Sequence, residues 1–169
     1  INGASGGIGT FAVQIAKSFG AEVTGVCSTR NIDFVRSIGA GYVIDYTKED
    51  FTKSRKRYDL ILDIVASRPM AEIEPVLTPA GSYVLTGGDM SRIIQVSMSK
   101  NKQMKNFTAM VNQEDLVYMK ELIESGKVVP VIDKEYPLWE TPQAIQYYGE
   151  RLSRGKIIIT IEKKEKENG

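Results

Sequence analysis

The stretch Gly3-Ala4-Ser5-Gly6-Gly7-Ile8-Gly9 decides the fold of this 169-residue chain. It lies where a first strand, represented only by a stub at Ile1, turns into a helix expected over 9–19. Glycines at such a turn let the backbone approach a pyrophosphate closely, and the amides of the helix N-terminus bind the anion. Ala4 replaces the first glycine of the strict G-x-G-x-x-G pattern, so a glycine-rich turn that serves packing alone is the alternative interpretation.

Apolar, β-branched runs alternate with helical patterns along the next hundred residues. Helices are expected over 31–38 and from Pro69 to near Gly81. Near-continuous apolar strands separated by helices indicate a parallel sheet that is covered on both faces. After the stub, the expected strands lie at 21–27, 42–44, 58–65, 82–86 and 107–111.

The end of the chain adds elements beyond this six-stranded core. Asn112 is expected to cap a helix through Ser125 that turns Leu116, Met119 and Ile123 inward. A strand at 128–132, a helix that starts at Thr141-Pro142 and a strand at 156–161 follow. We therefore expect an α/β fold with a C-terminal strand–helix–strand appendage.

Two small counts restrict the chemistry, because the chain has no histidine and a single cysteine, Cys27. A catalytic zinc site takes three protein ligands and a structural one takes four, so neither can be built from this inventory. Ser-His-Asp and Cys-His catalysis are excluded for the same reason. Cys27 is interpreted as a small core residue, and one cysteine cannot form a disulfide within the chain.

Charge and hydropathy favour neither nucleic acid nor membrane as a partner. Lys and Arg total 22 against 21 Asp and Glu, so the net charge is +1 and no strong field is expected. No window approaches 18 uninterrupted apolar residues and no signal peptide is visible, which favours a cytoplasmic protein. The basic run at 53–57 precedes a strand, at the sheet edge opposite the one that binds cofactor, and is interpreted as a solvated loop.

The end of the second strand bears on the choice of dinucleotide. An NAD enzyme keeps an acid there for the ribose hydroxyls, whereas this chain has Cys27-Ser28-Thr29-Arg30-Asn31. Arg30 and Ser28 can bind a 2′-phosphate that an acid would repel, so NADP(H) is favoured over NAD(H). The alternative is that Arg30 is a solvated residue at a helix start. Tyr46, just beyond the third strand, either flanks the adenosine end or simply packs.

Two dehydrogenase families begin in a similar way. The spacing Gly3-x-x-x-Gly7-x-Gly9 also satisfies the short-chain dehydrogenase glycine pattern, which would imply a catalytic Tyr-x-x-x-Lys. None of the eight tyrosines is followed four residues later by lysine, so this interpretation lacks its catalytic residues. The chain instead resembles medium-chain dehydrogenase/reductases of the zinc-independent quinone oxidoreductase, or zeta-crystallin, branch. The resemblance rests on ASGGIGTFAVQIAK at 4–17, CSTRN at 27–31, Gly39-Ala40, VIDY at 43–46, and matches at 115–116, 130–133 and 155–158.

This resemblance implies a Rossmann doubly wound parallel sheet of order 3-2-1-4-5-6 with a truncated first strand. It implies a dinucleotide-binding domain at 1–126, a segment at 127–161 that returns to an absent GroES-like catalytic domain, and a charged tail at 162–169. The chain is therefore expected to be a fragment of a larger polypeptide. Zinc ligands of zinc-type relatives lie mostly in that other domain, so the histidine count alone does not exclude zinc, or a zinc-type alcohol dehydrogenase, in a longer parent.

The resemblance also implies the site. Hydride would pass from NADP(H) to a quinone, enone or related carbonyl, with no catalytic residue visible in this chain. A non-catalytic NADP-binding module is the alternative, and a homodimer through the strand at 106–111 is possible. Asp63 is expected to be a buried, hydrogen-bonded carboxylate with a structural role. The implied cofactor contacts are Ser5, Gly6, Gly7 and Ile8 at the pyrophosphate, Ser28, Arg30 and Tyr46 at the 2′-phosphate, Val65, Ala66, Gly87 and Gly88 at the nicotinamide ribose and ring, and Lys156 from the returning segment.

Overall fold

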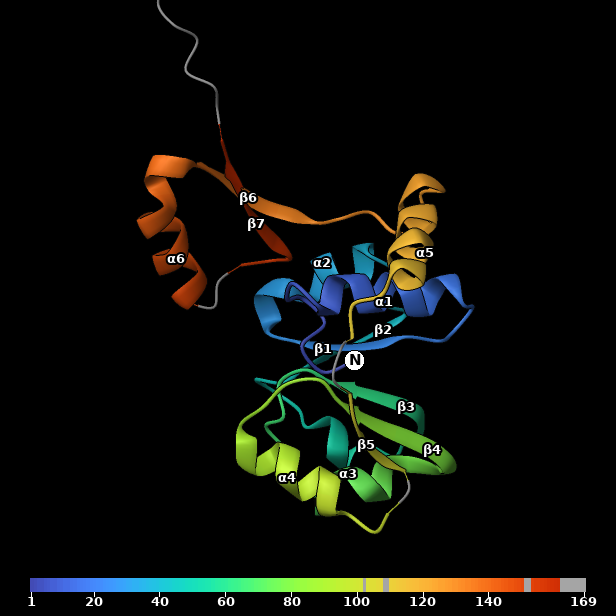
Figure 1. Ribbon diagram of the computed structural model, residues 1–169. Coiled ribbons are helices and arrows are strands. Elements are labelled where there is room, and N and C mark those ends of the chain that lie inside the picture. The colour runs from blue at the N-terminus through green and yellow to red at the C-terminus, as the bar shows by residue number, and fades with distance from the viewer. Residues whose placement is uncertain (102, 108–109, 151–152, 162–169) are drawn as a thin grey trace, which may run out of the picture.

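A computed structural model describes residues 1–101, 103–107, 110–150 and 153–161 of the chain. Its main sheet is parallel throughout, and Figure 1 shows its strands in the middle and lower parts of the molecule. The first parts of the chain form α1 (Gly9–Ser18), β1 (Thr24–Cys27), α2 (Ile32–Ser37), β2 (Tyr42–Asp45) and β3 (Tyr58–Asp63). The chain continues with α3 (Met70–Ile73), β4 (Leu77–Leu85), α4 (Met90–Met98) and β5 (Met104–Asn106).

Asn2 joins the two halves of this sheet. β1 pairs with β2, and β3 pairs with β4, which pairs with β5. Asn2 forms parallel bridges to Val26 of β1 and to Asp63 of β3, so it occupies the place of the first strand. The spatial order is therefore β2, β1, Asn2, β3, β4, β5, which confirms the predicted Rossmann order 3-2-1-4-5-6.

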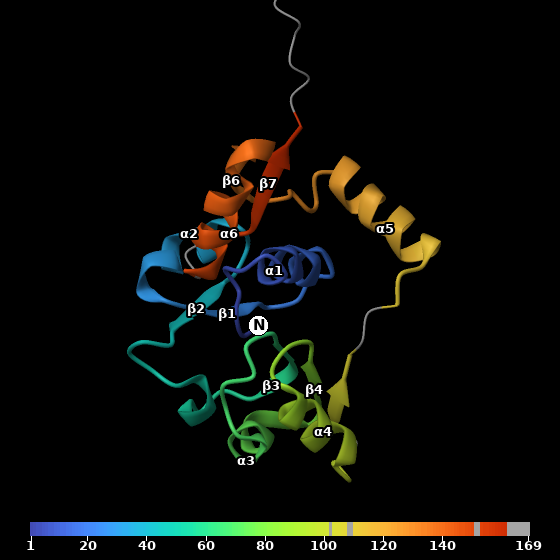
Figure 2. The same cartoon turned by 60° about the vertical axis from the view of Figure 1, so that its left-hand side comes forward.

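Neighbouring residues of β1 point to opposite faces of the sheet and enter separate cores. Val26 belongs to a cluster with Ile73 and Val96, on the face covered by α3 and α4. Cys27 belongs to a cluster with Val13 and Val35, on the face covered by α1 and α2. Figures 1 and 2 show the two helix pairs on opposite sides of the strands. The sheet is thus buried on both faces, as its near-continuous apolar strands predict.

The C-terminal part forms a separate parallel pair. α5 (Gln113–Glu124) precedes β6 (Ile132–Pro137), α6 (Thr141–Gly149) and β7 (Lys156–Thr160), with β6 paired to β7. Gln14 of α1 holds the start of this part, because its side chain both donates to Val129 O and accepts from Val129 N, at 3.0 and 2.8 Å. The strand–helix–strand appendage is therefore confirmed. Its first strand lies at 132–137 and not at the predicted 128–132.

Several other predicted boundaries are wrong. The helix after Pro69 ends at Ile73, and a 3-10 turn at Glu74–Val76 leads into β4 at Leu77. The sixth strand is β5, at Met104–Asn106, whereas the prediction was 107–111 and the dimer prediction used 106–111. Thr108 and Ala109 lie outside the described residues, as does the predicted tail at 162–169. Helix α4, at Met90–Met98, occupies a sequence stretch for which no element was predicted.

The cap of α5 is confirmed, but its inward face is not. Asn112 Oδ1 accepts from Asp115 N at 2.8 Å, so the predicted N-cap is present. Leu122 is the buried residue of the helix, whereas Leu116 and Ile123 are exposed. The face of α5 that packs is therefore rotated from the predicted one.

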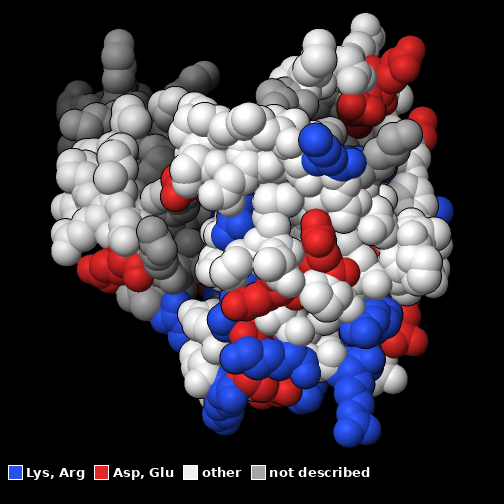
Figure 3. All heavy atoms as spheres, turned by 90° about the horizontal axis from the view of Figure 1, so that it is seen from below, with Lys and Arg blue, Asp and Glu red and all other residues white. Residues whose placement is uncertain are grey.

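The charged surface contains both signs. On the face drawn in Figure 3, Lys and Arg side chains are interspersed with Asp and Glu. Lys56, from the basic run at 53–57, lies over the ring of Tyr42 at 3.3 Å from its centroid and 3.8 Å from Glu22. No helix in the described parts of the chain is long and apolar enough to cross a bilayer.

Replacing Gly9 with alanine should destabilise the fold. A Cβ at this position would lie 2.1 Å from Gly3 O and 2.7 Å from Ala4 Cα, both of them backbone atoms that cannot move alone. We expect Gly9→Ala to lower the free energy of unfolding by about 2 kcal/mol or more, measured by urea denaturation. Gly41→Ala is the control, because its nearest contact would be an ordinary 3.9 Å and the change should stay within about 0.5 kcal/mol.

Candidate functional site

A cavity of about 1370 Å³ lies at the carboxyl ends of the central strands. This is the crevice where open α/β sheets bind their ligands, and it is large beside pockets of about 300–1,000 Å³ that hold drug-sized molecules. Loops that follow the strands of the main sheet line one side of the cavity, and residues of the C-terminal appendage line another. It brings together nine of the residues proposed from the sequence: Ser5, Gly6, Gly7, Ile8, Ser28, Arg30, Tyr46, Val65 and Lys156.

The glycine loop presents backbone to this cavity. Gly3 has φ +92°, a conformation that favours glycine, and it turns the chain out of the sheet. α1 then begins at Gly9, and within the described residues no side chain caps its first turn. Thr10 N already donates to Gly6 O at 3.0 Å, so the amides that could bind an anion are those of the loop just before it. A Cβ at Gly7 would lie 3.1 Å from Lys156 Nζ and 3.2 Å from Gly155 O, so glycine keeps the opposite wall close.

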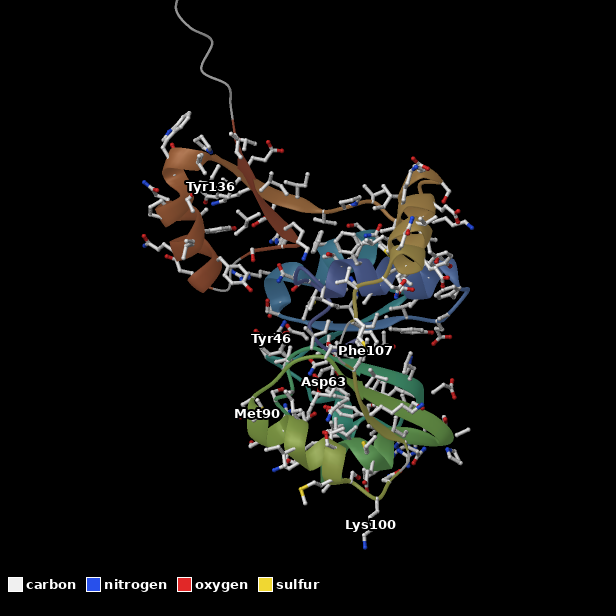
Figure 4. The ribbon with its side chains drawn as sticks, in the orientation of Figure 1. Tyr46, Asp63, Met90, Lys100, Phe107 and Tyr136 are labelled. Atoms are coloured by element: carbon white, nitrogen blue, oxygen red, sulfur yellow. The ribbon has the colours of Figure 1, made fainter. Side chains whose placement is uncertain are left out.

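The turn after β1 and the end of β2 form one corner of the cavity. Ser28 precedes the 3-10 turn Thr29–Asn31, Arg30 lies within it, and Tyr46 follows β2 with 58% of its surface exposed. Figure 4 shows Tyr46 at the level where the upper and lower parts of the molecule meet.

Asp45 holds that corner together without lining the cavity. Its carboxylate accepts hydrogen bonds from the Thr29 hydroxyl and from the hydroxyl and backbone N–H of Thr47, at 2.7 and 3.0 Å for Thr47. The bond from Thr29 is the largest influence that holds the pKa of Asp45 below its usual range, and Thr47 and Lys48 act in the same direction against partial burial. The carboxylate therefore ties the turn that carries Arg30 to the end of β2.

Asp63 is fully buried and joins three strands through its side chain. Oδ1 accepts from Asn2 Nδ2 at 2.8 Å, from Val65 N at 3.1 Å and from Ala66 N at 2.8 Å. Oδ2 accepts from the hydroxyl of Tyr83 at 2.9 Å, and burial together with the adjacent carboxylate raises the pKa of Tyr83. Figure 4 shows Asp63 in the interior, between the strands. The predicted structural role of Asp63 is consistent with these contacts.

Ala66, Gly87 and Gly88 do not line the cavity but form the packing behind it. Ala66 has φ +58°, held there by the bond from its N–H to Asp63. A Cβ at Gly87 would lie 2.2 Å from Ile64 O, and one at Gly88, where φ is +100°, would lie 2.6 Å from Ala66 Cβ. These glycines let the loops after β3 and β4 pass in close contact, which positions Val65 at the cavity.

The wall of the cavity contains an ion pair that was not predicted from the sequence. Arg68 Nη1 lies 2.9 Å from Asp50 Oδ2, and both residues line the cavity. Burial works to raise the pKa of Asp50, but hydrogen bonds from Thr52 and the charges of Arg68 and Lys53 hold it below its usual range. No motif marks this pair, because it forms between loops that follow different strands.

The appendage supplies the remaining wall. Gly155 N donates to Ser5 O at 3.0 Å, which brings Ser153 and Lys156 against the glycine loop. One face of α6 adds Thr141, Ala144, Ile145 and Tyr148. Their spacing of three and four marks one helix face, but the sequence does not say what that face meets.

The described residues offer no site for a metal or a thiol nucleophile. No group of three or more His, Cys, Asp or Glu in the described ranges could hold a metal ion. Burial, followed by the charge of Asp45, raises the pKa of Cys27 to about 11, so the thiol is almost wholly protonated at neutral pH. The side chains in the described ranges therefore do not fit zinc chemistry.

Known proteins match over most of the chain. A family model described as "Zinc-binding dehydrogenase" matches residues 38–159. The "Chloroplast envelope quinone oxidoreductase homolog" of Arabidopsis thaliana is 34% identical over an alignment of 168 positions, which covers 94% of this chain and 51% of that protein. The mouse (Mus musculus) protein "NAD(P)H oxidoreductase RTN4IP1, mitochondrial" is 32% identical, and the match covers 95% of this chain and 47% of that protein.

A solved structure agrees with these matches. The quinone oxidoreductase from Coxiella burnetii superposes with a TM-score of 0.84 at 26% identity, covering 95% of this chain and 51% of that one. The chain thus spans about half the length of the curated relatives it matches.

Replacing Asp63 with leucine should destabilise the chain strongly. Leucine would leave four donors without an acceptor, those of Asn2 and Tyr83 in buried and those of Val65 and Ala66 in part-buried positions, so we expect Asp63→Leu to lower the free energy of unfolding by about 3 kcal/mol or more. Asp63→Asn keeps an acceptor and can donate to Tyr83, so it should cost only about 1–2 kcal/mol. Asp59→Asn, exposed on the same strand, is the control, and equal effects at 59 and 63 would contradict the role of Asp63.

The stabilising contribution of Asp45 should disappear in acid. Because its folded pKa is lowered, the carboxylate stabilises the fold above its ordinary pKa, and this contribution is lost as the pH falls through the folded pKa. Thr29→Val should raise the pKa of Asp45, followed by NMR titration of its carboxyl carbon. The variant should be less stable than the parent at pH 7, and the difference should shrink in acid. An unchanged pKa would show that Thr29 does not hold this carboxylate.

Proposed function

This chain belongs to the zinc-binding dehydrogenase family of oxidoreductases, and from that premise we propose that it is the NADP(H)-binding part of a quinone or enone reductase. The observation that carries the proposal is the cavity at the carboxyl edge of the sheet. It combines the uncapped start of α1 with Arg30 and Ser28 at the end of β1, where no acid stands. The first feature suits a pyrophosphate and the second suits a 2′-phosphate.

The residues present fit this cofactor. The glycine loop at 5–8 would bind the pyrophosphate through backbone amides, with Lys156 Nζ opposite Gly7 as a counter-charge. Ser28 and Arg30 would bind the 2′-phosphate, and Tyr46 would flank the adenosine. Val65, held by the Asp63 network, would approach the nicotinamide ribose, with Ala66, Gly87 and Gly88 supporting it from behind.

The bound nicotinamide would supply hydride to a conjugated carbonyl or quinone, while the protein binds, orients and excludes water. Two relatives with quinone oxidoreductase in their printed names support this substrate class. The residues of this chain do not fit zinc, so no step is assigned to a metal. A non-catalytic NADP-binding module is the other candidate. It would be favoured if the full-length protein bound NADPH but reduced neither quinone nor enone.

Two further proposals concern assembly and location. The edge of β5 at 104–106 is the outer edge of the described sheet, so pairing of two copies there would give the homodimer expected from the sequence. Cytoplasmic location stays a prediction, because the printed names of the relatives point to chloroplast and mitochondrion.

Reversing the charge at position 30 should change the cofactor preference. Arg30→Glu would replace a charge-assisted hydrogen bond to the 2′-phosphate by repulsion, so we expect NADPH affinity to fall by about 10- to 100-fold, with NADH affinity nearly unchanged. Isothermal titration of both cofactors measures this. Arg57→Glu, an exposed position before β3, is the matched control. Equal affinity of the parent chain for NADPH and NADH would refute the assignment of NADP(H).

A further inference from the structure

Three segments that are far apart in the sequence are closed into one ring of hydrogen bonds at the cavity. The first is the glycine loop, the second is the turn at 28–31, and the third is the segment 153–156, which we call the strap. Asn31 Nδ2 donates to Ser5 Oγ at 3.0 Å, and Arg154 Nε donates to Asn31 Oδ1 at 2.8 Å. Gly155 N donates to Ser5 O at 3.0 Å and completes the ring.

Arg154 ties the strap to two residues of the turn. Its Nη2 also donates to the backbone oxygen of Arg30 at 2.9 Å, so one guanidinium holds two adjacent residues of the turn. The planar guanidinium presents its donors in a fixed arrangement, which lysine cannot reproduce. The guanidinium carbon also lies 5.9 Å from the centroid of the Phe34 ring, which supports it from the side.

Arg154 acts from behind the cavity wall. Ser153, Gly155 and Lys156 line the cavity, as do Arg30 and Asn31, but Arg154 itself does not. The strap also contacts the glycine loop through the bond from Gly155 N to Ser5 O, and Gln14 separately holds the appendage at Val129, before β6. Loss of Arg154 would therefore free the return of the appendage from the turn while leaving its start attached.

We infer that Arg154 is a positioning residue, and that it works as a latch that preassembles the cofactor cavity by tying the strap to the turn at 28–31. This inference rests on the proposed function. The latch orders two walls of the cavity before the cofactor arrives, so the ordering cost is not taken from the binding free energy. Because Arg154 holds the turn through the backbone oxygen of Arg30 and the side chain of Asn31, and does not line the cavity itself, we expect it to serve NADPH and NADH alike.

Buried Asn31 is suited to the middle of this latch. Its amide uses both ends, donating to Ser5 and accepting from Arg154. Aspartate would lose the donor and leucine would lose both functions. From the sequence alone, Asn31 has no role beyond its place in the CSTRN motif, because its partner Arg154 lies 123 residues away.

The test compares cofactor affinities of the full chain and its variants. Arg154→Ala should weaken NADPH and NADH by the same factor, about tenfold, because one charged hydrogen-bond network is lost in both cases. Arg154→Lys keeps the charge but not the geometry, and it should behave like Arg154→Ala. Arg36→Ala removes an exposed arginine of α2 and is the control, with no expected change. Circular dichroism and the melting temperature establish that each variant is folded.

A double-mutant cycle and hydrogen exchange complete the test. Asn31→Ala and Arg154→Ala should not add in their effects on affinity, because each breaks the same ring. In the cofactor-free chain, the amide of Gly155 should exchange at least about tenfold faster in Arg154→Ala than in the parent. Should the parent bind neither cofactor, the proposed function fails and the inference fails with it. Unchanged affinity in Arg154→Ala, or loss confined to NADPH, would overturn the latch alone, and the second result would place Arg154 on the 2′-phosphate.

Discussion

The sheet depends on the backbone of Asn2 and on the carboxylate of Asp63 beneath it. Asn2 N donates to Leu62 O at 2.9 Å and Ile64 N donates to Asn2 O at 3.2 Å, while Val26 N donates to the preceding residue, Ile1. A single residue thus takes the place of a central strand between β1 and β3. The side chain of Asn2 then donates to Asp63, which binds β4 through Tyr83. Both halves of the sheet are fixed by this small polar centre.

The same centre also determines where a ligand can bind. Strand order reverses around Asn2, so the connections to α1 and α3 leave the sheet on opposite faces and open a crevice between them. Gly3 turns the chain into this crevice, and Asp63 holds the loop of Val65 and Ala66 beside it. A buried carboxylate with four donors is a costly group unless every bond is made. Here it specifies the geometry of two loops that approach the cavity.

The sequence predicts well the features that local chemistry determines. The glycine turn between strand and helix and the cap at Asn112 follow from conformational freedom and hydrogen bonding within a few residues. The sequence predicts poorly those element boundaries that depend on which other part of the chain a segment packs against. The apolar residues at 128–132 indicate a strand, but Val128 is buried by packing and β6 begins at Ile132.

Contacts between residues that are far apart in the sequence are the second class of features that the sequence does not reveal. The ring of Ser5, Asn31 and Arg154 and the pair of Asp50 with Arg68 join residues that no spacing rule connects. Arg154 is separated from Lys156 by one residue only, yet the resemblance marks Lys156 alone. Its importance becomes visible when the strap lies against the turn.

Asp45 raises the strongest physical objection to a 2′-phosphate at this corner, since an acid at the end of β2 would repel it. The geometry answers this objection. The carboxylate is buried, accepts three hydrogen bonds from Thr29 and Thr47 and lies 3.8 Å from Lys48 Nζ, so its charge is already compensated. An acid that selects NAD must instead point its oxygens at the ribose hydroxyls. The carboxylate oxygens of Asp45 instead accept hydrogen bonds from Thr29 and Thr47. The bond from Thr29 holds in place the turn whose backbone carries Arg30.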